Sequence, residues 1–285
     1  MPVSRKSFWQ PALLPFWLLV LLPLAAGLCY ALLYSFGLAG LLAEGFILRH
    51  WGETFTRREV WASLLHSLRI AATVVLFSAA AALWLARRLR SRLDGAFPAA
   101  WLYLPLVTPG LVAAFAAFQL LSGSGLLARV LAAAGLIAGP AEMPELVLDP
   151  WAWGVVITHC FLAIPFLVML FHQLYKSERV EEYRRLASSL GATARQNLWR
   201  VEIPLLIRAA AGNLALLLVL VLGSYEVPLL LGRQSPQMLS VLIVRHFSMF
   251  DLGQKPVAYA LALLYTLVVV LALGLTWRRQ APDET

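Results

Sequence analysis

Charge is scarce in this sequence of 285 residues. Asp, Glu, Lys and Arg together make up 13% of the chain, and hydrophobic residues reach 61%, whereas soluble domains are roughly 25% charged and 45–50% apolar. The uncharged runs cover residues 7–43, 70–86, 95–128, 150–175, 209–225 and 256–277. A bilayer core about 30 Å thick needs about 20 apolar helical residues to cross it. We therefore predict an all-α integral membrane protein rather than a soluble domain.

The sequence has few cysteines, and it lacks the motifs of ATP-binding and hydrolytic enzymes. Cys29 and Cys160 are the only cysteines and lie in different uncharged runs, which excludes a disulfide framework and a cysteine metal site. The chain has no phosphate loop of the form GxxxxGK(S/T), no GxSxG nucleophile turn and no HExxH metal motif. We expect no catalytic residue, no metal and no bound cofactor in this chain, so any ATP is hydrolysed by another subunit.

The basic residues orient the expected helices. We predict six spans with both termini in the cytoplasm, at residues 11–36, 64–86, 99–121, 151–174, 208–231 and 256–277. With this topology the cytoplasmic segments hold 15 of the 23 basic residues and seven of the 15 acidic ones, so the whole net charge of +8 lies inside. The basic balance thus reflects topology and anionic lipid, and we expect no nucleic-acid partner. The uncharged stretch 130–141 is too short to span and is expected to form an interfacial or re-entrant helix.

The expected organisation has three parts. Residues 1–63 form the first helix and an outer segment, residues 64–279 form a core of five helices with a cytoplasmic loop at about 176–207, and residues 280–285 form a tail. A basic start followed by an apolar run also suits a signal peptide, but this run is longer than the core of a signal peptide. We therefore expect the first helix to be retained.

The loop at 176–207 has the pattern of two short helices joined by a tight turn. The stretch SERVEEYRRLASSL places Val180, Tyr183, Leu186, Ala187 and Leu190 on one helical face. Gly191 follows, the residue type that most readily ends a helix in the left-handed conformation. TARQ at residues 193–196, with Thr193 as the cap and Gln196 three residues later, has the form of a capping box that starts a second helix. That second helix is expected to end before Pro204, which suits the first turn of the fifth span.

Two interpretations of this loop are open on physical grounds. A basic amphipathic helix can lie on the lipid surface. A compact helix–turn–helix is better suited to docking onto a protein, because a helix that lies on lipid needs no glycine turn.

The loop resembles the EAA loop in permease subunits of ABC importers. The family signature reads Glu-Ala-Ala, three residues, Gly, nine residues and Ile-x-Leu-Pro, and this sequence has Ala187, Gly191 and Val201-Glu202-Ile203-Pro204 at those spacings. Val201 and Ile203 are conservative changes from Ile and Leu, and two positions depart further, because Arg185 stands where the family has Glu and Leu186 where it has the first Ala. The resemblance extends over roughly residues 60–277, and GSYEVPLLLG at 223–232 is similar to permeases grouped with polyamine, thiamine and ferric-iron importers.

The resemblance implies a type I ABC importer permease in a bacterial inner membrane. Its partners would be a cytoplasmic ATPase dimer that uses ATP, a second similar or identical permease, and an extracytoplasmic solute-binding protein. The loop would be a coupling helix seated in the ATPase, and Arg185 suggests a dedicated ATPase partner. The residues implied in coupling are Tyr183, Arg185, Ala187, Ser188, Ser189, Gly191, Ala192, Thr193 and Pro204.

Polar residues within the expected spans are candidates for the solute path. Glu226, an acid interrupting the fifth span, could attract a cationic solute. It could instead be an interfacial carboxylate, either hydrogen-bonded near Pro228 or paired with Arg233 or Arg69. The other candidates, which join helices at least as often as they line a path, are Tyr225, Ser224, Asn213 and Gln119.

The solute and one alternative function class stay open at this level. The resemblance at 223–232 favours a polyamine such as spermidine or putrescine, or another small solute. The alternative is a secondary transporter or channel driven by an ion gradient, which predicts internal repeats and several intramembrane charges. We find no convincing repeat and one such acid.

Overall fold

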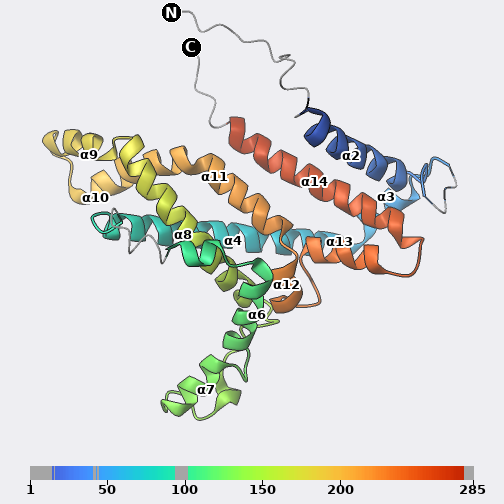
Figure 1. Ribbon diagram of the computed structural model, residues 1–285, viewed down its shortest axis with the longest axis horizontal. Coiled ribbons are helices and arrows are strands. Elements are labelled where there is room, and N and C mark those ends of the chain that lie inside the picture. The colour runs from blue at the N-terminus through green and yellow to red at the C-terminus, as the bar shows by residue number, and fades with distance from the viewer. Residues whose placement is uncertain (1–14, 16, 41–42, 44, 94–101, 279–285) are drawn as a thin grey trace, which may run out of the picture. The chain divides into compact units, whose positions relative to one another are not determined.

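A computed structural model describes residues 15, 17–40, 43, 45–93 and 102–278 (Figure 1). All regular structure within these ranges is helical, with no β-strand, which confirms the all-α class. The expected cytoplasmic ends, residues 1–14 and the tail at 280–285, lie outside the described ranges. Six helices are long and apolar enough to cross a membrane, at Trp17–Ser35, Arg58–Leu89, Gly110–Ala133, Trp153–Ser177, Ala194–Gly223 and Gln254–Gly274.

The chain divides into two compact units. One comprises Met1–Val60 with Ile243–Leu267, and the other comprises Trp61–Leu242 with Val268–Thr285. The helices α4 (Arg58–Leu89), α13 (Leu239–Ser248) and α14 (Gln254–Arg278) each contribute residues to both units. The predicted boundary at residue 63 stays a prediction.

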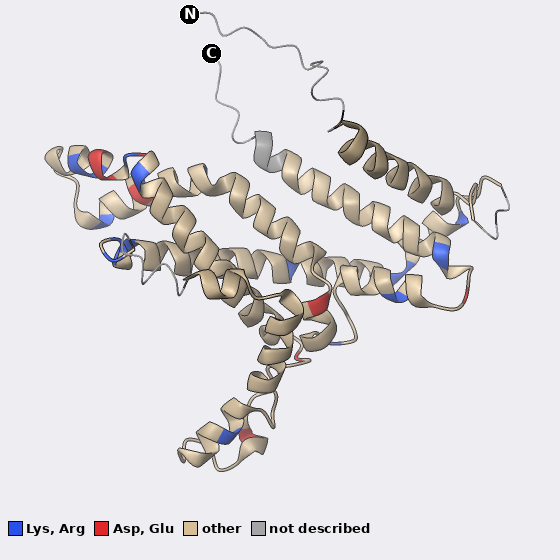
Figure 2. Ribbon diagram, viewed as in Figure 1, with Lys and Arg blue, Asp and Glu red and all other residues tan. Residues whose placement is uncertain are grey.

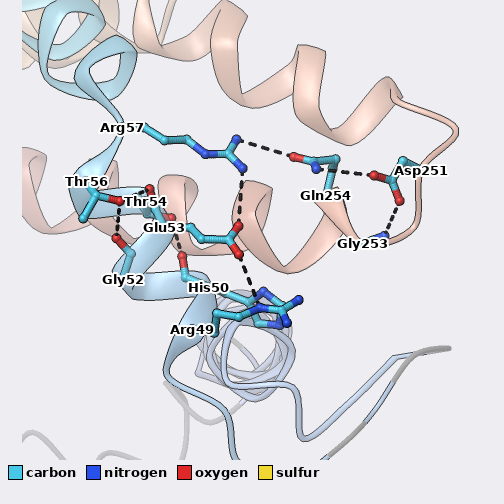
Figure 3. A network of polar contacts seen from close by, with 10 residues as sticks. All are labelled: Arg49, His50, Gly52, Glu53, Thr54, Thr56, Arg57, Asp251, Gly253 and Gln254. Carbon is cyan, nitrogen blue, oxygen red and sulfur yellow. Dashed lines mark hydrogen bonds and ion pairs between the residues drawn. The ribbon is translucent and has the colours of Figure 1, made fainter.

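The first unit contains η2 (Trp17–Leu21), α2 (Leu22–Ser35) and α3 (Arg49–Thr56). Half-buried aromatic rings pack together in it: the ring centroid of Tyr259 lies 4.5 Å from that of Tyr34 and 4.9 Å from that of Phe247. A polar network ties α3 to the start of α14, because Arg57 reaches Glu53 at 3.4 Å and Gln254 at 3.5 Å (Figure 3). These contacts join segments almost 200 residues apart in the sequence.

The second unit contains most of the predicted core. Its further elements are α6 (Gly110–Leu121), α7 (Leu126–Ala133), η3 (Pro140–Glu142), α8 (Trp153–Ser177), α9 (Val180–Ser189), α10 (Ala194–Gln196), η4 (Asn197–Glu202), α11 (Ile203–Gly223) and α12 (Glu226–Leu231). Here α11 packs on α8, and α12 packs on α6 (Figure 1). Small buried residues such as Ala82, Ala86 and Ala210 allow helices in a membrane to approach closely.

The third span differs from its predicted bounds. The expected helix at 99–121 is interrupted near Thr108 and Pro109, and α6 begins only at Gly110. Proline has no N–H to continue a helical ladder, and Pro109 has the extended backbone of a helix cap. The predicted interfacial helix at 130–141 is also wrong in its bounds, because α7 covers Leu126–Ala133 and the chain turns at Gly135 with φ 70°.

The fifth span starts and ends earlier than predicted. Its helix runs without a stop from Ala194 to Gly223, so the prediction that the second loop helix ends before Pro204 is wrong. The π-helical η4 explains why, because the N–H of Ile203 bonds to the carbonyl of Leu198, five residues back, just ahead of the proline. The helix then stops at Gly223, where Ser224 takes an extended conformation.

Candidate functional site

The first helix of the loop ends in a Schellman motif centred on Gly191. This residue has φ +87°, and its N–H bonds to the carbonyl of Ser188 while that of Ala192 bonds to the carbonyl of Ala187, both at 3.0 Å. These two bonds satisfy carbonyls that the end of a helix otherwise leaves without partners. The predicted glycine turn is therefore present, and it follows from local backbone chemistry.

The second helix of the loop begins with the predicted capping box. The Thr193 side chain accepts a hydrogen bond from the N–H of Gln196, and the Gln196 side chain accepts one from the N–H of Thr193 at 2.8 Å. We call residues 180–202, which comprise α9, α10 and η4, the loop hairpin. Gly191 and Thr193 together reverse the chain between its two helices.

Asn197 closes the loop hairpin on itself, a contact that sequence analysis missed. It is buried, and its Nδ2 donates to Ser188 Oγ at 2.8 Å. In the sequence, the contact is indicated only by a single Asn next to the capping box. The hairpin is thus held by its own side chains as well as by its turn.

The predicted apolar face of α9 is divided between interior and solvent. Val180 is buried and Ala187 is half-buried, whereas Tyr183, Leu186 and Leu190 are exposed. We call these last three the apolar stripe, since their spacing of three and four residues puts them on one side of the helix. Leu190 is 82% exposed, which is costly for a leucine in water. The stripe is therefore a surface available for burial.

The other predicted coupling residues surround this stripe. Ser188, Ser189, Gly191 and Thr193 are exposed and Ala192 is half-buried. Pro204 is exposed at the start of α11. A shallow hollow beside the turn is lined by Ala187, Leu190, Gly191, Ala192, Gln196, Arg200 and Val201.

Charged residues gather where the loop hairpin meets the end of α4 (Figure 2). Arg90 lies 3.0 Å from Glu181, and Arg87 lies 3.2 Å from Glu202. Glu202 also accepts a hydrogen bond from the Tyr175 hydroxyl at 3.0 Å. Sequence analysis assigned no role to Arg87 or Arg90, because only the packing of the helices brings them to the loop.

Glu181 is the common partner of the arginines on α9. Arg184 donates to it at 2.8 Å, and Arg185 lies 3.6 Å away with a side chain that is 80% exposed. Burial acts to raise the pKa of Glu181, but the hydrogen bonds and charges of Arg184 and Arg90 outweigh it and lower that pKa. Arg185, the position that differs from the family signature, thus faces solvent with most of its surface.

The residues predicted for the solute path are only partly brought together. Ser224, Tyr225 and Glu226 are consecutive at the break between α11 and α12. Asn213 lies on α11, eleven residues before Ser224, which is roughly 16 Å along the helix at about 1.5 Å per residue. Gln119 lies on α6, nine residues after Gly110, which is roughly 13 Å from the start of that helix. The five residues do not form one cluster.

Glu226 lies beyond the helix that was predicted to contain it. It is the first residue of α12 and is exposed. Within the described part of the chain it forms no ion pair, neither with Arg69 nor with Arg233. Its Oε2 lies against the start of α6, where a Cβ on Gly110 would approach it to 3.0 Å. Arg69 instead donates to the carbonyl of Pro150 at 3.1 Å and covers the ring of Trp151. The ion pair predicted for Glu226 as an interfacial residue is therefore not found among the described residues, and its role in the solute path stays a prediction.

Metal-ligating residues do not cluster in the described ranges, in which no group of three His, Cys, Asp or Glu side chains could hold an ion.

Comparison with known proteins identifies the family and the fold of the chain. Residues 75–278 match the family described as binding-protein-dependent transport system inner membrane component. The chain belongs to this family. It is thus a multi-pass permease subunit of the binding-protein-dependent ABC importer type.

The permease is similar to curated thiamine permeases. It is 29% identical over 290 residues to the thiamine transport system permease protein ThiP of Brucella suis biovar 1 (strain 1330), and 28% identical to that of Brucella melitensis biotype 1. Each alignment covers 97% of this chain but 50% of the relative. The chain therefore spans about half the length of the curated relatives it matches.

Solved structures show the same fold. A chain in the crystal structure of a bacterial alginate ABC transporter, in complex with an alginate pentasaccharide-bound periplasmic protein, matches with a TM-score of 0.71 at 18% identity. This match covers 93% of the permease and 91% of that chain. A second structure of an alginate importer matches with a TM-score of 0.70 at 17% identity.

Proposed function

We propose that the permease forms a solute path across the bacterial inner membrane and that its loop hairpin docks into a separate ATPase. The apolar stripe is the observation that carries this proposal. The hairpin is already closed by Asn197 and by its two caps, so Tyr183, Leu186 and Leu190 are not needed to hold it together. A partner that covers these side chains removes their apolar surface from water.

The partner chain is expected to supply the chemistry. This permease has no phosphate loop, so ATP is bound and hydrolysed by the ATPase dimer. Closure of that dimer would move the docked hairpin, and the movement would shift the membrane helices between outward-open and inward-open packings. Exposed Arg185 would meet an acidic residue of a dedicated ATPase.

The path is expected to need a second permease half and a solute-binding protein. The thiamine permeases to which this chain is similar are about twice as long as the aligned region. A second half, identical or similar to this one, would complete the path. The binding protein would deliver the solute to the outer side, where Ser224, Tyr225 and Glu226 would line the entrance and Asn213 and Gln119 the way through.

Thiamine is the first solute to test. The similarity to thiamine permeases extends over 97% of the chain, and it gives no support to the expected polyamine specificity. Thiamine is a cation, so exposed Glu226 at the entrance has a charge that would attract it. Isothermal titration of the cognate binding protein with thiamine, and with spermidine as the competing solute, tests this assignment.

Coexpression with the ATPase of the same importer tests the docking. Leu190→Asp places a charge on the apolar stripe and should prevent copurification of the ATPase, while the variant still enters the membrane. Leu252→Asp, at an exposed leucine far from the loop in sequence, is the matched control and should leave copurification unchanged. Normal recovery of the ATPase with Leu190→Asp would overturn the docking role.

A further inference from the structure

Two acids of the loop hairpin are bound to the last turn of α4 and to the residue that follows it. Glu181 comes from α9 and Glu202 from η4, so each helix of the hairpin contributes one. Their partners, Arg90 and Arg87, are three residues apart, with Arg87 in the last turn of α4 and Arg90 directly after its end. A body that is held at two separate points cannot rotate freely about either of them.

Tyr175 links the two ion pairs. Its hydroxyl donates to Glu202, and the guanidinium of Arg90 lies over its ring with 5.7 Å to the centroid. Tyr175 is itself 5% exposed near the end of α8. The two ion pairs and this ring form one connected set, which we call the clasp: Arg87, Arg90, Tyr175, Glu181 and Glu202.

Burial makes the inner contact of the clasp persistent. The Glu202 side chain is 3% exposed, and a buried carboxylate is strongly unfavourable once its cationic partner is removed. Arg87 therefore has to follow Glu202 when η4 moves. The outer contact between Arg90 and Glu181 is half-exposed and adds the second point of attachment.

The fold of the hairpin does not require the clasp. Its turn, its capping box and the bond between Asn197 and Ser188 lie wholly within residues 180–202. The charges that face α4 are additional to these contacts, and they connect the hairpin to a 32-residue helix long enough to cross the membrane.

We infer that the clasp transmits the movement of the loop hairpin to α4, with Arg87 and Arg90 as positioning residues. The inference rests on the proposed function, because a docked ATPase supplies the movement. Displacement of α9 and η4 then moves the end of α4 directly, in addition to the movement carried along the continuous helix from Ala194 to Gly223.

Hydrogen exchange of the permease assembled with its ATPase tests the clasp, with ATP and vanadate as the probe. In the wild type, trapping of nucleotide should change exchange both in the hairpin at 180–202 and in the end of α4 at 80–90. Arg90→Glu places two acids opposite each other and should abolish the change in α4 while the change in the hairpin is kept. The double variant Arg90→Glu/Glu181→Arg swaps the two charges, and it should restore the nucleotide-dependent change in hydrogen exchange of α4.

Arg88→Glu is the matched control, with the same change of charge next to Arg87 on the same helix. Arg88 is exposed, and its replacement should leave the response of α4 intact. A full response of α4 in the Arg90→Glu complex would overturn the clasp while leaving the docking in place. Absence of any response in the wild-type hairpin would overturn the proposed docking and the clasp with it.

Discussion

The amide of Asn197 donates a hydrogen bond to Ser188 Oγ across 2.8 Å and so joins the two helices of the loop hairpin. Its Nδ2 also lies 3.5 Å from the carbonyl of Arg184, at the edge of hydrogen-bonding distance. A buried amide that bridges two short helices helps to fix their spacing, in addition to the turn between them. The hairpin can therefore move as one rigid body when a partner protein pushes or pulls on its surface.

Replacement of Asn197 should loosen the hairpin. Asn197→Ala removes the donor, and exposed Ser188 Oγ can then bond to water, so the cost should be about 0.5–1.5 kcal/mol. Hydrogen exchange of residues 180–202 measures the effect. A cycle with Ser188→Ala should show a coupling of about 0.5–1.5 kcal/mol between the two side chains. Additive effects of the two changes would contradict the bridging role.

Gly191 has room for a methyl group, but its backbone conformation is unfavourable for alanine. No atom lies within 4 Å of a Cβ built at this position, and its φ is +87°. Gly191→Ala should therefore cost about 1–2 kcal/mol of backbone strain and speed exchange around the turn roughly 5–30-fold. Gly52→Ala is the control, because that helical glycine also has open space but no positive φ; it should stabilise its helix. Equal responses of the two variants would rule out strain as the cause.

Gly191→Pro should be more severe than Gly191→Ala. Proline fixes φ near −65° and removes the N–H that bonds to Ser188. We expect transport to be lost while the protein still enters the membrane. Uptake of solute at the wild-type rate by this variant would refute the coupling role of the turn.

Gly154 and Gly110 should differ in their tolerance of alanine. A Cβ at Gly154 would lie 2.4 Å from the backbone oxygen of Leu146, which cannot move without its chain. Gly154→Ala should thus lower stability by about 1–3 kcal/mol. A Cβ at Gly110 would meet only the end of the exposed Glu226 side chain, so Gly110→Ala should be close to neutral. Thermal unfolding in detergent compares them, and a similar loss for both would show that Glu226 is held rigidly.

Acid should weaken the contacts of Glu181. Its pKa is lower in the folded protein than the ordinary value of 4.5. A carboxyl with a depressed pKa contributes stability that is present above 4.5 and is lost as pH falls through the folded pKa. The difference in thermal midpoint between wild type and Glu181→Gln should therefore be largest near neutral pH and shrink below pH 4.5. A difference that is independent of pH would show that packing, and not charge, accounts for the effect.

The amino-acid sequence by itself determined the class of the protein and the turn of its loop. Long uncharged runs require helices in a membrane. Gly191 and Thr193 act through bonds to residues at most five positions away, so their roles could be inferred without knowledge of the fold.

Only the tertiary structure decided which side chains meet over long distances. Arg87 and Arg90 reach acids 115 and 91 residues later because α4 packs beside the loop hairpin. Val180 is buried and Leu190 is exposed to solvent, although both belong to one apolar pattern. The end of the helix at Gly223 likewise separates Glu226 from the span to which its apolar neighbours assigned it. Periodicity describes which residues share a face of a helix, but what covers that face depends on the neighbouring helices.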